Sequence, residues 1–320
     1  MSDKVLITGG FGYLGGRIAC DVDCQASWQV RLGSRSASNP PSWLPGVQTV
    51  PFDLSKPDGF AGALKEVRTV VHLAALNEVE SLKFPERAVE INTLGTLRLL
   101  NAAIHAGVER FIYFSTAHVY GAPLAGHITE ASLPRPVHPY AITHHAAEEF
   151  VLAAHDKGSI QGIVLRLSNG FGAPTHSEVD RWMLLVNDLC MQALRDRKLV
   201  LLSSGIQQRD FITLHDVGRV VSHFLNLSQE GLADGLFNVG GESSMTVLAM
   251  AERIIRCCQE TLGYAPTLVR PQPSANEVGL ELNYDINKLK NTGFILCGNM
   301  DEEIKQTLKV CAAMQQGSKA

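Results

Sequence analysis

Three glycines spaced three residues apart, Gly9, Gly12 and Gly15, form the pattern in this chain that is best suited to chemistry. They follow the short apolar run of residues 5–8 and precede an amphipathic run. Glycines at this spacing let the backbone turn tightly, approach a pyrophosphate group and pack the next helix against the strand. The phosphates would lie at the N-terminus of that helix, which favours an anion. The sequence therefore predicts a dinucleotide site at this turn.

Apolar runs and amphipathic helices alternate along the first half of the chain. The predicted strands are residues 5–8, 29–33, 47–54, 69–75, 111–115 and 162–167. A predicted helix of residues 85–106 carries Val89, Leu97, Leu100 and Ile104 toward the sheet, and a second helix covers about residues 140–155. This alternation predicts an α/β fold with a doubly wound parallel sheet of the Rossmann type.

The pattern becomes less regular after Asn169. Helices are expected near residues 182–195, 214–227 and 300–314, and short strands at 198–202 and 236–239. We therefore expect a Rossmann domain of residues 1–168 and a smaller α/β substrate-binding cap of residues 169–320, with residues near 212–241 partly returning to the first domain. The cap would lie over the carboxyl ends of the strands, where open α/β sheets bind ligands.

The end of the second predicted strand is where the ribose of a dinucleotide should lie. An acidic residue there would bind the ribose hydroxyls of NAD, but this chain has Ser34 and Arg35. These side chains could receive a 2′-phosphate instead, so the sequence favours NADP as the cofactor over NAD. In the alternative interpretation Arg35 is a solvated loop residue, the backbone holds the ribose, and NAD can be the cofactor.

The composition excludes several classes of partner. The chain has 320 residues, of which 45% are hydrophobic and 19% charged, and its formal net charge is −4. No basic excess would attract nucleic acid or an anionic membrane, and no apolar run is long enough to span a bilayer. The N-terminus shows no secretion signal, and the seven scattered cysteines are typical of reduced thiols, with Cys257 and Cys258 expected on a helix. These features predict a cytoplasmic protein.

The eleven histidines lack the spacing of a zinc site, so no metal is expected.

Further motifs accumulate along the chain until they identify a family. After the glycine turn come Asp53-Leu54, His72-Leu73-Ala74-Ala75, Asn92, the segment Phe114–Gly121, Pro139-Tyr140, and Arg209-Asp210-Phe211. Together these motifs resemble the extended short-chain dehydrogenase/reductases, specifically the NAD(P)-dependent sugar epimerase/dehydratase group. The resemblance covers about residues 4–241.

The resemblance implies a role for each of these positions. Tyr140 would be the acid/base that exchanges a proton with the substrate while nicotinamide exchanges a hydride, and Thr116 would be its hydrogen-bonding helper. Asn169 and Arg209 would contact the substrate, with Arg209 on a diphosphate. The cofactor would be contacted by Gly9, Gly12, Tyr13, Leu14, Gly15, Arg35, Asp53, Leu54, Ala74, Asn92, Tyr140 and His144.

One position departs from the family pattern. Four residues after the tyrosine the family carries a lysine, which lowers the pKa of the tyrosine and binds the cofactor ribose, whereas this chain has His144. A histidine with its ordinary pKa near ~6.5 is charged in only about a quarter of molecules at pH 7. Three interpretations remain open. His144 replaces the lysine in an enzyme that is more active at lower or unusual pH, the site has become weakly active or inactive, or His145 or His118 shares the proton transfer.

The resemblance also narrows the reaction. After the helper threonine, dehydratases of this group carry Asp-Glu, whereas this chain has Ala117 and His118, so we expect a 4-epimerase or a simple oxidation or reduction of a sugar carbon. The substrate would be a sugar or a nucleotide sugar, although the second diphosphate-binding arginine is missing unless Arg270 takes its place. The alternative function is a non-catalytic NAD(P)-binding sensor or scaffold. Because many members of this family form dimers through a face that includes the tyrosine helix, we expect a homodimer through the apolar face of residues 149–152.

Overall fold

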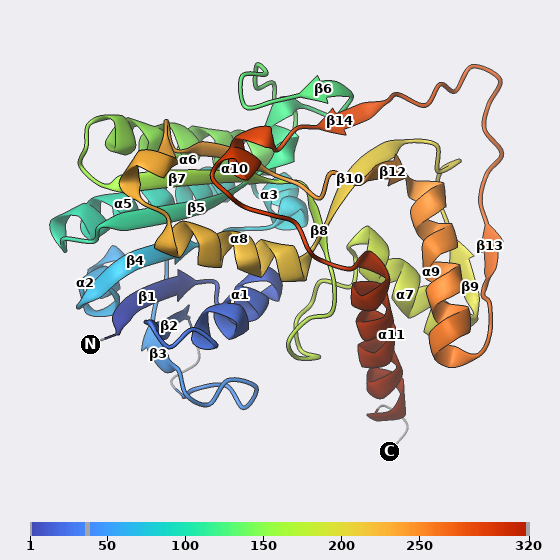
Figure 1. Ribbon diagram of the computed structural model, residues 1–320, viewed down its shortest axis with the longest axis horizontal. Coiled ribbons are helices and arrows are strands. Elements are labelled where there is room, and N and C mark those ends of the chain that lie inside the picture. Colours follow the sequence, from blue (N-terminus) through green and yellow to red (C-terminus); the bar gives the residue numbers. More distant parts are fainter. Residues whose placement is uncertain (1, 36–38, 318–320) are drawn as a thin grey trace.

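The computed structural model describes residues 2–35 and 39–317, and a seven-stranded parallel sheet forms the middle layer of the lobe on the left of Figure 1. The strand order is β11-β7-β5-β4-β1-β2-β3. These strands are β1 (Asp3–Thr8), β2 (Trp28–Ser34), β3 (Gln48–Pro51), β4 (Val67–His72), β5 (Arg110–Thr116), β7 (Gln161–Leu167) and β11 (Leu236–Val239). The α/β fold of the Rossmann type is confirmed. The order reverses between β1 and β4, and ligands bind at such a switch point in open α/β sheets.

Helices cover both faces of this sheet because successive residues of each strand point to opposite sides. In β1, Val5 and Ile7 pack against α1 (Tyr13–Asp23) and α8 (Leu214–Asn226), whereas Leu6 packs with the layer on the other face. That second layer contains α2 (Phe60–Ala63), which follows the short η1 (Pro57–Gly59), together with α5 (Thr96–His105) and α6 (Pro139–Asp156). Both faces are therefore buried, as expected of apolar parallel strands.

The predicted helix of residues 85–106 is interrupted by a π-helical segment. After α3 (Glu78–Lys83), the chain forms α4 (Pro85–Ala88), the π-helix η2 (Val89–Gly95) and then α5. The wider π turn changes the helical phase. The prediction that Val89 faces the sheet was wrong, because its side chain is 54% exposed, whereas the prediction for Leu100 is confirmed, because it is buried together with Leu99 and Ala103.

A second lobe packs around its own apolar core (Figure 1). It contains β8 (Asn169–Phe171), α7 (Leu185–Asp196), β9 (Lys198–Val200), β10 (Gln208–Thr213), β12 (Ser244–Thr246), α9 (Val247–Leu262), β13 (Thr267–Val269) and α11 (Met300–Gly317). Cys257 and Cys258 lie buried on α9, which confirms that they pack on a helix. The remaining elements are η3 (Ala117–Tyr120), β6 (Gly126–Ile128), η4 (Gln229–Leu232), β14 (Leu282–Tyr284) and α10 (Asn287–Asn291).

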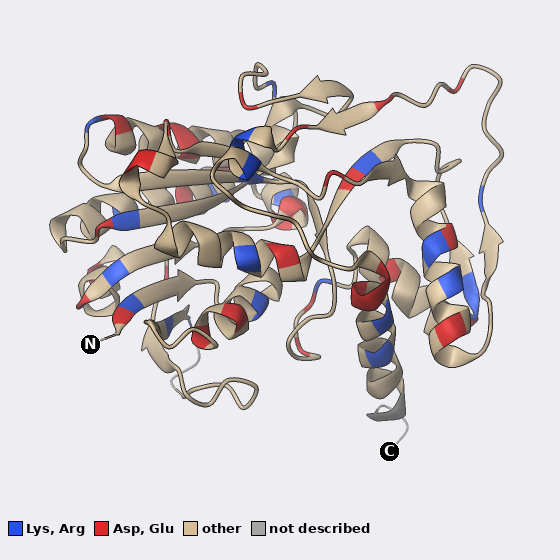
Figure 2. Ribbon diagram, in the orientation of Figure 1, with Lys and Arg blue, Asp and Glu red and all other residues tan. Residues whose placement is uncertain are grey.

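Partly buried polar contacts hold the two lobes together. The Arg17 guanidinium of α1 donates to the Glu303 carboxylate of α11 at 2.7 and 3.2 Å and to the Ala173 carbonyl oxygen at 2.9 Å. Figure 2 shows residues of both charge signs interspersed over the two lobes. Within residues 2–35 and 39–317, no helix is both long and apolar enough to cross a membrane.

The apolar face expected at residues 149–152 needs one correction. Val151 is fully buried, because it packs against the sheet with the rest of the α6 inner face. The exposed apolar side chains of α6 are Ile142, which is 48% exposed, and Phe150, which is 40% exposed.

Candidate active site

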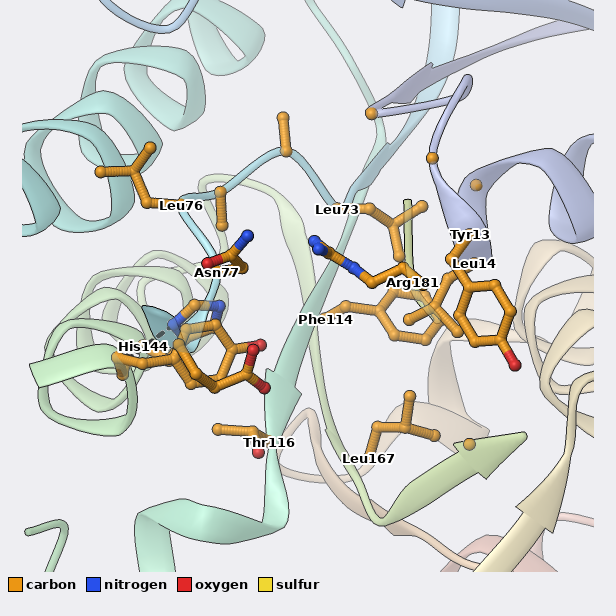
Figure 3. Close-up of a pocket in the computed structure, with 18 of the residues that line it drawn as sticks. Tyr13, Leu14, Leu73, Leu76, Asn77, Phe114, Thr116, His144, Leu167 and Arg181 are labelled. Atoms are coloured by element: carbon orange, nitrogen blue, oxygen red, sulfur yellow. Dashed lines mark hydrogen bonds between the residues drawn. The ribbon is translucent and has the colours of Figure 1, made fainter. Parts of the chain in front are cut away.

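A cavity of about 770 Å³ lies at the carboxyl ends of the central strands (Figure 3). The glycine turn, the ends of β4 and β5, the start of α6 and the segment that leads into α7 form its wall. All predicted site residues except Asn92 line it: Gly9, Gly12, Tyr13, Leu14, Gly15, Arg35, Asp53, Leu54, Ala74, Thr116, Tyr140, His144, Asn169 and Arg209. The fold thus brings together residues that are far apart in the sequence.

The glycine turn leaves room for a ligand at the start of α1. Gly9 has a φ of +68°, and its carbonyl oxygen accepts a hydrogen bond from the Gly12 N–H at 2.8 Å. A Cβ atom on Gly15 would lie 2.2 Å from the same oxygen, so a side chain would not fit there. No side chain caps the N-terminus of α1, so its first N–H groups can bind an anion. This backbone cradle fits the pyrophosphate of a dinucleotide.

Tyr13 lines the cavity, but its hydroxyl group is engaged elsewhere. The hydroxyl donates to the Gly172 carbonyl oxygen at 2.7 Å and lies 3.2 Å from Oδ1 of Asn187 on α7. Burial raises the pKa of Tyr13 far above its ordinary value. This side chain therefore connects the glycine turn to the second lobe.

The far end of the cavity contains the side chains expected around an adenosine. Ser34, Arg35, Asp53 and Leu54 line it. Oδ1 of Asp53 accepts hydrogen bonds from the Ser55 hydroxyl at 2.7 Å and the Ser55 N–H at 2.9 Å, and these bonds hold the pKa of Asp53 below its usual value. Arg35 is exposed and lines the same space, so a cation is available at this end of the cavity.

A buried polar network supports the wall formed after β4. The His72 ring lies 2.7 Å from the Thr8 hydroxyl through Nδ1 and 2.9 Å from the Thr96 hydroxyl through Nε2. Because the Thr96 hydroxyl donates to the Asn92 carbonyl oxygen, it accepts from Nε2–H, and the Thr8 hydroxyl donates to Nδ1. Burial lowers the pKa of His72 to about 3, so the ring is neutral.

Asn92 belongs to this support and does not line the cavity. It is 1% exposed, accepts from the Leu76 N–H at 2.7 Å and donates to the Thr143 hydroxyl at 3.1 Å. Its position in the π-helix connects α6 to the segment after β4. The amide therefore positions the cavity wall at Leu76.

His144 is packed against Tyr140 and is uncharged at neutral pH. The two ring centroids lie 4.1 Å apart, and Nδ1 of His144 lies 2.8 Å from the Tyr140 carbonyl oxygen, to which it donates. The side chain is 3% exposed, and burial lowers the pKa of His144 to about 4. At pH 7 about one molecule in a thousand would carry the charge. The cation that a lysine would provide at this position is therefore absent.

Tyr140 and Thr116 face the same space from α6 and β5. Burial raises the pKa of Tyr140 strongly, so the resting side chain is a neutral phenol. The Thr116 oxygen accepts a hydrogen bond from the His118 N–H at 3.2 Å, which leaves the Thr116 hydroxyl hydrogen free to donate into the cavity.

The other histidines divide between the cavity and the surface. His118 lines the cavity, and burial lowers its pKa. His138 caps α6 by accepting from the Tyr140 N–H at 3.2 Å, whereas His145 lies 3.4 Å from the Glu149 carboxylate. Of the two neighbours considered for proton transfer, only His118 therefore shares the cavity with Tyr140. In the described part of the chain, no three His, Cys, Asp or Glu side chains are grouped closely enough to hold a metal ion.

The substrate side of the cavity is formed by the start of β8 and β10. The Asn169 amide donates to the Asp210 carbonyl oxygen at 2.8 Å. The buried Asp210 carboxylate accepts from the Ser168 hydroxyl and from the N–H groups of Gly241 and Ser243, which fixes the backbone beside Arg209. Arg270 donates to the Ser204 carbonyl oxygen at 2.7 Å and is not part of the cavity wall.

Three charged residues of the cavity were not predicted from the sequence. Glu78 follows the N-cap residue Asn77 at the start of α3, Arg87 lies on α4, and Arg181 lies in the segment before α7. None of the three belongs to a motif that we identified. The only available signal for Glu78 was its place shortly after a buried strand, and Arg181 gave no signal at all.

Comparison with known proteins identifies related sequences. The sequence model of the NAD dependent epimerase/dehydratase family matches residues 5–240. The dTDP-D-glucose 4,6-dehydratase of Mus musculus is 34% identical over 203 residues, which are 62% of this chain and 54% of that enzyme. The UDP-glucose 4-epimerase of Rhizobium leguminosarum bv. trifolii is 33% identical over 184 residues, 56% of each chain. The chain spans about half the length of these curated relatives.

Solved structures match over nearly the whole chain. The Thermus thermophilus UDP-glucose 4-epimerase, solved in complex with NAD, is 25% identical and has a TM-score of 0.79, with 97% of this chain and 99% of that chain covered. A UDP-glucuronic acid 4-epimerase from Bacillus cereus is 22% identical and has a TM-score of 0.80, which shows a common fold.

Proposed function

The chain belongs to the NAD-dependent epimerase/dehydratase family, and from this premise we propose that it is an NAD(P)-dependent 4-epimerase or oxidoreductase of a sugar, with a nucleotide sugar as substrate. One observation carries the proposal. Tyr140 and Thr116 line the same cavity as the glycine turn, so a substrate oxygen and a dinucleotide can meet there. The related UDP-glucose 4-epimerases of Rhizobium leguminosarum and Thermus thermophilus support this substrate class.

The residues of the cavity fit a dinucleotide. The N–H groups at the start of α1 would hold the pyrophosphate, and Asp53 and Leu54 would contact the adenosine. When bound, the nicotinamide supplies the acceptor or donor of a hydride. Because Arg35 faces the cavity where no acidic residue follows β2, we propose that NADP binds more tightly than NAD.

Tyr140 would move the proton that accompanies the hydride. In the reducing direction its neutral phenol donates a proton to the carbonyl oxygen as the carbon gains hydride, and the product is an alcohol. In the oxidising direction a phenolate takes the hydroxyl proton as the carbon loses hydride. The Thr116 hydroxyl would donate a hydrogen bond to the same substrate oxygen, because its own oxygen already accepts from the His118 N–H.

Loss of water needs further acid/base groups, which argues against a dehydratase. Ala117 is buried and carries no titratable group, and its neighbour is His118 rather than a carboxylate. On the substrate side, Arg209 would contact a diphosphate without the help of Arg270, because the Arg270 guanidinium donates a hydrogen bond to the Ser204 carbonyl oxygen.

One observation favours the second candidate function, a non-catalytic or weakly active NAD(P)-binding sensor or scaffold. The uncharged His144 does not stabilise a phenolate at Tyr140 in the way that a lysine would. We also propose a homodimer through the exposed apolar side chains of α6, Ile142 and Phe150.

Binding and turnover separate the two functions. Purified protein is titrated with NADPH and NADH while cofactor fluorescence is followed, and turnover is then measured with 4-hydroxy and 4-keto nucleotide sugars. The enzyme proposal expects cofactor binding and a turnover that Tyr140→Phe reduces at least about 100-fold, within the range attributed to general acid/base groups. Binding without turnover, in both the wild type and Tyr140→Phe, would support the sensor or scaffold.

A further inference from the structure

The uncharged His144 raises the question of which group, if any, places a positive charge near Tyr140. Three charged side chains of the cavity, Glu78, Arg87 and Arg181, have no role in the proposal above, and two of them, Glu78 and Arg181, act on the Tyr140 phenol. Glu78 lies at the N-terminus of α3, and Arg181 lies in the segment between β8 and α7. Their charges are opposite, so they act on Tyr140 in opposite directions.

Arg181 extends into the cavity from the second lobe. Figure 3 shows its side chain in the middle of the cavity, between the side that carries Tyr13 and Leu14 and the side that carries His144 and Thr116. Within the described ranges, its guanidinium makes a single hydrogen bond, 3.3 Å from the Asp180 carbonyl oxygen, and no ion pair. Most of its five N–H donors therefore remain available.

The backbone of Arg181 is held in place from the cofactor turn. The buried Asn187 side chain donates to the Arg181 carbonyl oxygen at 3.2 Å, and its Oδ1 atom lies 3.2 Å from the Tyr13 hydroxyl. The same hydroxyl donates to the Gly172 carbonyl oxygen at 2.7 Å, at the other end of the segment. The arginine is thus presented by a hydrogen-bonded connection between the two lobes.

We propose that Arg181 supplies, from the second lobe, the positive charge near the Tyr140 hydroxyl that the family's lysine supplies from α6. This role rests on the proposed acid/base function of Tyr140. Arg181 is then a positioning residue: it acts through the phenol by favouring its ionised form, and it takes no proton itself because a guanidinium stays charged at every working pH.

The charges around Tyr140 leave Arg181 as its cationic neighbour. The phenol's pKa is raised first by burial and then by Glu78, whereas Arg181 lowers it. Burial keeps His144 and His118 neutral by lowering their pKa values, and it raises the pKa of Tyr113 on β5 far above the usual range. The titratable and charged groups around Tyr140 are Glu78 of α3, Tyr113 of β5, His118 of η3, His138 at the N-cap of α6, His144 of α6, and Arg181. Arg87 and Arg209 also line the cavity, but Arg181 is the cation that lowers the pKa of Tyr140.

Fluorine NMR tests this role without any turnover. Tyr140 is replaced by 3,5-difluorotyrosine, a more acidic phenol that ionises while the protein is still folded, and its fluorine shift is followed against pH in the full-length protein. We expect Arg181→Gln to raise the ionisation midpoint by about one pH unit, the size that a unit charge roughly 10 Å away produces at an effective dielectric constant of about 20. Arg181→Lys should restore most of the shift.

Two further variants serve as controls for the ionisation midpoint of Tyr140: one should shift it in the opposite direction, and the other should leave it unchanged. Glu78→Gln should lower the midpoint, and Arg35→Gln, at the adenosine end of the same cavity, should leave it within about 0.3 pH units. An unchanged midpoint in Arg181→Gln, or a failure of Arg181→Lys to restore it, would overturn the inference. Turnover with UDP-glucose as the probe is measured in parallel. Its absence would overturn the proposed function, while the fluorine titration still decides whether Arg181 acts on the phenol.

Discussion

Replacing His144 by lysine tests how much catalytic power the site lacks. The ring centroids of Tyr140 and His144 are 4.1 Å apart, so an ammonium group at this position would lie close to the phenol. A unit charge about 5 Å away at an effective dielectric constant of about 20 contributes about 3 kcal/mol, or about two pKa units. Burial of the lysine opposes part of this gain, because a desolvated ammonium loses its proton more readily.

The pH dependence gives the direction of the effect. Tyr140 has a raised pKa, so the phenolate that accepts the substrate proton becomes more abundant as pH rises, and oxidation should accelerate about tenfold per pH unit between about pH 6 and 9. His144→Lys lowers the phenol pKa and should increase oxidation at pH 7 by about 10- to 100-fold. Initial rates are followed by the absorbance of the reduced cofactor, with UDP-glucose and NAD⁺ or NADP⁺ as the probes.

His144→Gln is the matched control, because it removes the ring and introduces no charge. Since burial lowers the pKa of His144 to about 4, the histidine is already neutral above about pH 5, and the glutamine variant should keep its turnover within about threefold of wild type. Wild-type activity should likewise show no inflection near pH ~6.5, the ordinary pKa of histidine. An inflection there that both variants remove would refute the reasoning and restore His144 as a charged replacement for lysine.

Three further variants test the rest of the site. Gly15→Ala should abolish NADH binding in a fluorescence titration, because its Cβ would lie 2.2 Å from the Gly9 carbonyl oxygen; Gly62→Ala, where a Cβ meets nothing within 4 Å, should bind normally. Arg35→Asp should weaken NADPH binding at least about tenfold more than NADH binding, since a charge-assisted hydrogen bond contributes about 1.5–3 kcal/mol, and an equal loss for both cofactors would contradict a 2′-phosphate contact. Phe150→Glu should convert a dimer to a monomer in sedimentation velocity, and a wild type that sediments as a monomer would exclude the proposed α6 interface.

The sheet and the glycine turn could be predicted because their signals are local. A strand that is buried on both faces must be a continuous apolar run, and residues 5–8 and 111–115 are such runs. The turn needs glycine at residue 15, because a Cβ atom there would collide with the Gly9 carbonyl oxygen of the same turn. The failure at Val89 is also local in origin: the π-helical segment shifted the face, and the alternation of apolar residues does not reveal a wider turn.

The electrostatics of the site could not be predicted, because they depend on residues that the fold brings in from elsewhere. The sequence placed His144 one turn from Tyr140, but its charge depends on how far packing against Tyr140 and Tyr113 removes it from water. Asn92 was placed at the cofactor by its motif, whereas the structure buries it behind Leu76. Arg181 enters the cavity from a segment without any motif, since contacts with α7 determine its position.

Two roles of Tyr13 can be separated by experiment: the motif predicts a contact with the cofactor, whereas the hydrogen bonds of Tyr13 indicate that it supports Arg181. The sequence assigned it to the cofactor, whereas its hydroxyl reaches Asn187, whose amide holds the backbone of Arg181. Tyr13→Phe keeps the ring in the glycine turn and removes only the hydroxyl hydrogen that lies between the Gly172 carbonyl oxygen and Oδ1 of Asn187, at a cost of about 1 kcal/mol. If the hydroxyl serves Arg181, NADH affinity should stay within about twofold and the ionisation midpoint of fluorinated Tyr140 should rise, by less than in Arg181→Gln. A loss of NADH affinity with an unchanged midpoint would instead assign Tyr13 to the cofactor, and Arg181 would then reach the phenol independently of the glycine turn.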